Sequence, residues 1–196
     1  MSDARDTILA RLERARPPAV PQPEPMTPPP AVTDAIATLR DRVEEAGGVF
    51  QLASRTNWPN RIEWPDDLSA MNHVYSASSA VEARGVGRAA SDDRDLECLD
   101  LCVLRAEFAV VENGAVWHVP SSPRERAAAL LAQHLVVVVD RSELVPTLHQ
   151  AYERIDLAET TFGWFLCGPS KTADIEQSLV LGAHGPRTMS LVVCHD

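Results

Sequence analysis

The chain is poor in cysteine, in aromatic residues and in positive charge, and the first and last of these shortages each exclude a class of protein. Its 196 residues include four cysteines and 5% aromatic residues, with 18 Lys and Arg against 28 Asp and Glu. A disulfide-bonded scaffold has more cysteines in a shorter chain. The net charge of −10, without a basic patch, makes nucleic acid an unexpected partner.

Long apolar runs are also missing. No window of about 18 apolar residues is uninterrupted, so we expect no membrane span. The first residues, MSDARDTILARLERARPP, lack the apolar core of a secretory signal. We therefore expect a soluble cytoplasmic protein.

The four cysteines do not have the spacing of a metal site. Three residues separate Cys98 from Cys102, whereas zinc ribbons and ferredoxin clusters use a two-residue spacing. The six histidines show no ligand spacing either. We predict that Cys98, Cys102, Cys167 and Cys194 are small buried residues, and that the chain binds no metal.

Proline is abundant in one place. Eight of the fifteen prolines lie in residues 17–30, a composition that favours an extended polyproline II segment. We interpret it as a semi-rigid linker to a short helix at 3–15, and the alternative is a ligand for a proline-recognising module. The sequence thus predicts a tail over 1–32 and one domain over 33–196.

The domain alternates predicted helices with apolar strands. A helix is predicted between Thr33, which can act as its N-cap, and Gly47, which can take the left-handed conformation after its C-terminus. LVVVV (135–139) is typical of a strand buried on both faces, and Asn113-Gly114 predicts a hairpin turn. Further strands are expected at 49–53, in HVYSAS, in GWFLCG and in MSLVVC, and further helices in PRERAAALL and RSELVPTLHQAYERI. This alternation predicts an α/β fold, with a largely parallel sheet and helices on both faces.

The stretch FLCGPSKTADIEQSLVLGAHGP (165–186) is the candidate functional segment. We predict a strand, a Gly-Pro-Ser turn and a helix over DIEQSLVLG, because ligands of α/β sheets bind where such junctions meet the carboxyl ends of strands. The same residues also make good turn and capping chemistry, which is the alternative. The candidate binding residues are Gly168, Ser170, Lys171, Thr172, Asp174 and His184, with Glu112 and Asn113 from the hairpin.

The chemistry of this segment favours a singly charged ligand. Lys171 and the amides of a helix N-terminus suit a carboxylate or phosphate. Asp174 and Glu176 lower the local potential, so a carboxylate fits better than a polyphosphate. The spacing is not that of a P-loop, which needs a glycine four residues before Gly-Lys.

Two motifs carry a resemblance to a known family. GPSKTADIEQSLVLGAHGP closely resembles the C-terminal signature of the lactate-utilisation (LUD) domain family, and AEFAVVENGAVW (106–117) resembles a second block of that family. The resemblance covers roughly residues 35–194. Asn113 stands where the family usually has Thr, and Ala115 where it has Thr or Ser.

The resemblance implies both a fold and a role. The fold is that of ribose-5-phosphate isomerase and the CoA transferases. The role is in a three-protein system that oxidises L-lactate to pyruvate with iron–sulfur proteins as partners. This chain has no Cys-x2-Cys-x2-Cys run, so it resembles the cluster-free subunit. No catalytic residue is assigned. The alternatives are a stand-alone isomerase or CoA or acyl transferase acting on a small anion, or a carboxylate-sensing module.

Overall fold

A computed structural model of the chain defines its helices and strands. It describes residues 2–18, 20–21, 33–65, 71–78, 81, 88–90, 92–156, 158–173 and 179–196. The α-helices are α1 (Ser2–Arg14), α2 (Ala35–Glu45), α4 (Pro123–Leu131) and α5 (Leu148–Arg154), with 3-10 turns η1 (Trp58–Asn60), η3 (Asp93–Cys98) and η4 (Arg141–Glu143). The strands are β1 (Val49–Ser54), β2 (His73–Ser76), β3 (Arg88–Ala89), β4 (Leu101–Arg105), β5 (Phe108–Val110), β6 (Val116–His118), β7 (His134–Asp140), β8 (Leu144–Val145), β9 (Trp164–Leu166), β10 (Lys171–Ala173), β11 (Leu179–Leu181) and β12 (Thr188–His195).

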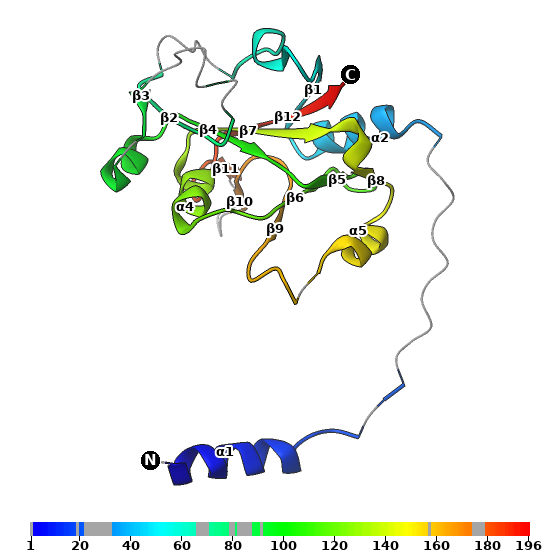
Figure 1. Ribbon diagram of the computed structural model, residues 1–196, viewed down its shortest axis with the longest axis vertical. Coiled ribbons are helices and arrows are strands. Elements are labelled where there is room, and N and C mark those ends of the chain that lie inside the picture. The colour runs from blue at the N-terminus through cyan, green and yellow to red at the C-terminus, as the bar shows by residue number, and fades with distance from the viewer. Residues whose placement is uncertain are drawn as a thin grey trace.

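A six-stranded sheet forms the centre of the domain (Figure 1). Its order is β1-β12-β7-β4-β2-β3, and each neighbouring pair is parallel. β7 carries the predicted continuous apolar run and is buried on both faces, as central strands of parallel sheets are. The predicted α/β fold is therefore confirmed.

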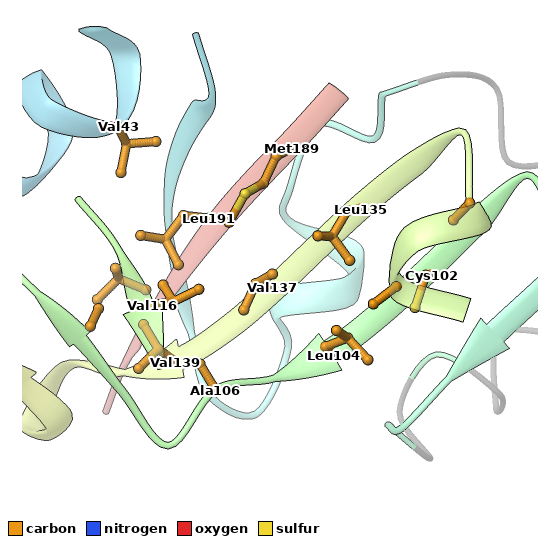
Figure 2. Packing of buried hydrophobic residues seen from close by; sticks show 14 of the residues in the cluster. Val43, Cys102, Leu104, Ala106, Val116, Leu135, Val137, Val139, Met189 and Leu191 are labelled. Carbon is orange, nitrogen blue, oxygen red and sulfur yellow. The ribbon is translucent and has the colours of Figure 1, made fainter. Parts of the chain in front are cut away.

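Two apolar clusters cover the two faces of this sheet. In the first, Leu191, Val137 and Leu104 of the sheet pack toward Val43 of α2 and Val116 of β6 (Figure 2). The second cluster buries the opposite face against the segment around η1 and the residues that lead into β2. Burial of these aliphatic side chains is the main stabilising contribution to the fold.

A second, four-stranded sheet has the order β8-β5-β6-β9. The predicted hairpin is confirmed, since β5 and β6 are antiparallel and Gly114 takes a φ of +74° at their turn. β9 is antiparallel to β6. The strand that leads into the candidate segment therefore belongs to this small sheet, not to the parallel one.

The prediction of a helix over DIEQSLVLG is wrong for its last part. Residues 179–181 form β11, which pairs antiparallel with β10, and residues 174–178 lie outside the described part of the chain. The Gly182 amide donates to the Ser170 carbonyl at 3.0 Å, and the Ser170 amide donates to the Pro186 carbonyl at 2.8 Å. These backbone bonds close a hairpin, and none of the described residues between 165 and 186 is helical.

Two helix ends differ from the prediction in detail. The N-cap of α2 is Asp34 rather than Thr33, because the Asp34 carboxylate accepts from two backbone amides of the first turn. Gly47 has the predicted left-handed conformation, with a φ of +83°. The helix expected from residue 141 begins only after Pro146, where Thr147 caps α5. Most of the proline-rich stretch lies outside the described residues.

α1 exposes the apolar side chains of Ile8, Leu9 and Leu12. Within the part of the chain that the structure describes, no helix is both long enough and apolar enough to cross a membrane.

Candidate functional site

The predicted turn packs against the C-terminal end of α2. Gly168 has a φ of +67°, and a Cβ placed on it would lie 2.5 Å from the carbonyl oxygen of Ala46. The Lys171 Nζ lies 3.1 Å from the position that a Cβ on Gly47 would occupy. Lys171 thus places its charge at the C-terminus of α2, where the helix dipole stabilises a cation. Both residues have a structural reason to be where they are.

Of the remaining candidate residues of the segment, the structure describes Ser170, Thr172 and His184. The Ser170 backbone closes the hairpin, and a Cβ on Gly185 would lie 3.0 Å from the Ser170 Cβ. Thr172 is described only as the partner of Val180 in the β10–β11 ladder. His184 is exposed, and Asp174 lies outside the described residues.

Glu112 and Asn113 are both engaged in local structure. The Glu112 carboxylate accepts a 2.8 Å hydrogen bond from the amide of Leu148, the first residue of α5. The Asn113 side chain accepts from the Ala115 amide at 3.0 Å, and the Asn113 carbonyl accepts from the Cys167 thiol at 3.4 Å. Asn113 therefore lies beside the turn. A ligand-binding role for these residues stays a prediction.

The four cysteines differ in their exposure to solvent. Cys98 and Cys167 are exposed, so the prediction that all four are buried is wrong for these two, while Cys102 and Cys194 are buried. Partial burial raises the pKa of Cys167, and the Lys171 charge acts in the opposite direction. Among the described residues, no group of three or more His, Cys, Asp and Glu is arranged to hold a metal ion.

A second polar cluster lies at the carboxyl edge of the parallel sheet. The ends of four strands meet there. Ser54 of β1 is level with His195 of β12, Cys194 of β12 with Asp140 of β7, and Arg105 of β4 with Val138 of β7. We name this cluster the carboxyl-edge site and define it by six residues: Arg55, Arg105, Asp140, Arg141, Ser142 and His195. Ligands of α/β sheets bind at such edges.

Asp140 bridges two arginines from different strand ends. Its Oδ1 lies 3.1 Å from the Arg55 Nε, and its Oδ2 accepts a hydrogen bond from the Arg105 guanidinium. The Asp140 side chain is 10% exposed, against 50% and 61% for Arg55 and Arg105. The carboxylate is thus buried and fixed, while both guanidiniums face solvent.

The Oδ1 of Asp140 is a buried oxygen in an ion pair. The Arg55 Nε lies 3.1 Å from it, although the contact does not have the geometry of a hydrogen bond. The opposite charge of Arg55 offsets part of the cost of burying the carboxylate.

Two pockets are lined by the arginines that pair with Asp140, one by Arg55 and the other by Arg105. The larger has a volume of about 520 Å³ and is lined by Arg55, Arg141, Ser142, Cys194, His195 and Asp196. The smaller, of about 230 Å³, is lined by Trp58, Ala77, Ser78, Leu104, Arg105 and Val138. The larger pocket falls within the roughly 300–1,000 Å³ range of small-molecule sites, and its two guanidiniums favour an anionic ligand.

The thiol beside this pocket is not a nucleophile at neutral pH. Burial, followed by the Asp140 charge, raises the pKa of Cys194 to about 11, against the weaker opposing effect of Arg105 and Arg55. The reactive form of cysteine is the thiolate, so Cys194 remains an unreactive thiol. The pocket is equipped to bind anions through arginine rather than to attack them.

Sequence reasoning missed this site although a signal existed. Arg55 follows the strand VFQLAS, Asp140 follows LVVVV, and His195 follows LVVC. Polar residues placed directly after three buried parallel strands must gather at one edge. The error was to apply this rule to β9, which joins the other sheet.

Comparison with known proteins identifies the family. The LUD domain matches residues 69–194. The chain belongs to the LUD domain family. This matched range contains Arg105, Asp140, Arg141 and Ser142 of the carboxyl-edge site, while Arg55 and His195 lie outside it.

Curated LUD relatives share a name. Lactate utilization protein C of Exiguobacterium sp. (strain ATCC BAA-1283 / AT1b) is 32% identical over 103 residues, covering 50% of this chain and 45% of the relative. Its counterpart from Geobacillus thermodenitrificans is 29% identical over 140 residues, covering 68% and 54%. That from Macrococcus caseolyticus is 26% identical over 174 residues, covering 84% and 73%. The first two matches thus span about half of each relative's length.

A solved structure supports the fold. The crystal structure of a DUF162 family protein from Deinococcus radiodurans superimposes with a TM-score of 0.63 at 17% identity, covering 82% of this chain and 96% of that one. At this identity the likeness shows that the LUD chain has the same fold.

Proposed function

We propose that this LUD protein acts in lactate utilisation, as the cluster-free subunit of an iron–sulfur system that oxidises L-lactate to pyruvate. Family membership and the shared name of the curated relatives support this role. Residues 33–196 would act as one unit, with residues 1–32 as a tether. The system would work in the cytoplasm.

The observation that carries the proposal is the pair of arginines in the larger pocket. Arg55 and Arg141 line a space at the carboxyl edge of the parallel sheet, and no described side chain forms an ion pair with Arg141. Guanidinium groups bind carboxylates with two parallel hydrogen bonds. The site is therefore suited to a small carboxylate such as lactate or pyruvate.

The oxidation itself requires partners. Converting lactate to pyruvate breaks a C–H and an O–H bond and releases two electrons and two protons. Because the chain lacks a cluster-binding cysteine run, we assign the electron acceptors to iron–sulfur proteins that bind it. In this arrangement, the iron–sulfur partners accept the electrons, and the present chain binds the carboxylate or delivers it to them.

The test is genetic and biochemical. A deletion strain, in an organism without another lactate dehydrogenase, should lose growth on L-lactate and keep growth on pyruvate. Gentle anaerobic co-purification from lactate-grown cells should recover iron–sulfur proteins. Normal growth of the deletion strain on L-lactate would contradict the proposal. Turnover of an anionic substrate by the isolated chain would instead support the alternative of a stand-alone enzyme.

A further inference from the structure

We propose that His118 and Glu125 share one buried proton in the folded protein, and that this pair makes the fold sensitive to alkaline pH. The inference does not depend on the ligand that binds at the carboxyl edge. His118 is the last residue of β6, and Glu125 lies in the first turn of α4. His118 is 2% exposed and Glu125 is 4% exposed, so the pair links the helix to the small sheet inside the domain.

The first step of the argument assigns a hydrogen to one ring nitrogen. The Nδ1 of His118 lies 3.0 Å from the backbone carbonyl oxygen of Arg105. A carbonyl oxygen only accepts hydrogen bonds, so Nδ1 must carry a hydrogen and donate it. In a neutral imidazole the second nitrogen, Nε2, then has a lone pair and no hydrogen.

The second step is the contact that this second nitrogen makes. The Nε2 of His118 lies 3.4 Å from the Oε1 of Glu125, and no described group forms a hydrogen bond with it. A neutral ring beside an ionised carboxylate would set a lone pair against a buried negative oxygen. One added proton removes this repulsion, either on the ring or on the carboxyl group. The geometry therefore requires one proton in the pair, whichever of the two groups carries it.

The third step concerns the other groups that face Glu125. Burial, followed by the charge of Glu125, raises the pKa of Tyr75 and the pKa of Cys102, so both stay neutral at pH 8. Arg124 donates instead to a carboxylate and to two backbone carbonyls around η3. The Oε2 of Glu125 accepts hydrogen bonds from the amide and the hydroxyl of Ser121. Within the described residues, His118 is thus the partner that Glu125 has for its Oε1.

The groups that face His118 do not replace the proton either. The guanidinium of Arg105 binds Asp140 at the carboxyl edge. Arg126 of α4 lies over the ring of Phe162, 4.8 Å from its centroid. From β9, the uncharged indole of Trp164 lies beside the imidazole, with 6.4 Å between the ring centroids. A buried carboxylate without a compensating charge is strongly destabilising, so loss of the shared proton should weaken the fold.

The direction of the pH effect follows from the number of bound protons. Above about pH 7.5, an unfolded chain has lost the proton of an ordinary histidine and of an ordinary glutamate. The folded pair still holds one proton, which unfolding releases. Stability therefore falls as pH rises, and the equilibrium constant for unfolding increases by up to about tenfold per pH unit. The fall ends once the folded pair has lost its proton as well.

The experiment measures the protons released when the full chain unfolds in urea at pH 8. In Glu125→Gln, an amide of the same shape can donate to the lone pair of Nε2, so no added proton is needed. We expect the wild type to release one proton more than this variant, and its unfolding constant to rise more steeply between pH 7.5 and 8.5. Asp93→Asn removes an exposed carboxylate that pairs with Arg124 and should behave as the wild type.

Equal proton release by the wild type and Glu125→Gln would overturn the inference. If Glu125→Gln does not fold, nuclear magnetic resonance of the wild type at pH 8 decides the question through the nitrogens of His118 and the carboxyl carbon of Glu125. We expect either a ring with hydrogens on both nitrogens or a protonated carboxyl group. A ring with a single hydrogen beside an ionised carboxylate would contradict the shared proton.

Discussion

The turn at 167–186 and the carboxyl edge of the parallel sheet are both rich in polar residues, but their polar groups are used differently. In the described part of the turn, several polar groups are engaged in local structure. Lys171 lies at the end of α2, and the Ser170 backbone closes a hairpin. At the carboxyl edge, Arg55 and Arg105 pair with Asp140 but keep at least half of their side chains exposed, and Arg141 lines the pocket without an ion pair to any described side chain.

This contrast shows that the density of polar residues does not identify a site. A binding site is identified by the polar groups that remain available to a ligand after folding. Their number depends on hydrogen bonds and ion pairs between residues far apart in the sequence. We therefore assign a role in stability to the turn and propose that ligands bind at the carboxyl edge.

The largest expected effect is on stability, in Gly168→Ala. A side chain there would adopt a left-handed φ of +67° and place its Cβ 2.5 Å from the Ala46 carbonyl oxygen. We expect a loss of roughly 2–3 kcal/mol in the free energy of unfolding, measured by urea denaturation. His184→Ala, in an exposed part of the same segment, should change stability by less than about 0.5 kcal/mol. If Gly168→Ala is as stable as the wild type but no longer binds lactate, the binding site lies at the turn and not at the carboxyl edge.

The next effect is on binding, in Arg55→Ala and Arg141→Ala. Each removes a guanidinium from the larger pocket, and the loss of a charge-assisted bond is worth about 1.5–3 kcal/mol. Affinity for L-lactate, measured by calorimetry, should fall roughly tenfold to a hundredfold in each variant. Thermal denaturation serves as the control and should show little change in Arg141→Ala. Unaltered affinity in both variants would show that the pocket does not bind the acid.

A smaller effect concerns pH and Cys194. The folded thiol has a pKa of about 11, against an ordinary value of 9.0, so the folded state holds this proton more tightly than the unfolded state. Between pH 9 and 11 the unfolded chain loses the proton first, and stability falls as pH rises. Cys98 has an exposed thiol, so Cys98→Ala serves as the control. Across this pH range, the urea concentration at the unfolding midpoint should fall less steeply in Cys194→Ala than in Cys98→Ala. Parallel curves would contradict the burial of Cys194.

The smallest effect is that of Lys171→Ala. A cation at a helix C-terminus contributes about 0.3–1 kcal/mol, so unfolding should become easier by that amount, while the affinity for L-lactate should not change. Lys171→Arg keeps the charge and should restore most of the stability in low-salt urea titrations. A binding defect in Lys171→Ala that Lys171→Arg repairs would instead mean that this charge serves a ligand.

Local sequence signals predicted much of the fold. The β-branched run of β7, the Asn113-Gly114 turn and the Gly47 terminus of α2 are each determined by a few neighbouring residues, and all three are confirmed. The LUD motifs identified the family. Residues 179–181 were misassigned because a short apolar run fits both a helix face and a strand, and the pairing with β10 decided between them.

The candidate site was harder to predict because it depends on which sheet each strand joins. The residues GWFLCG predict a strand, but nothing in them shows whether that strand joins the parallel sheet or the small four-stranded sheet, to which β9 belongs. Contacts such as Arg105 with Asp140 join residues 35 positions apart. The buried approach of His118 Nε2 to Glu125 Oε1, at 3.4 Å, likewise had no sequence signal, because neither residue stands in a motif.

Growth on L-lactate tests the central claim most directly. A deletion strain would be complemented with the wild-type chain, with the double variant Arg55→Ala/Arg141→Ala, or with Lys171→Ala, each at equal protein levels by immunoblot. The account predicts that the wild type and Lys171→Ala restore growth and that the double variant does not, while all strains grow on pyruvate. Growth with the double variant and failure with Lys171→Ala would place the working surface at the turn and contradict the account.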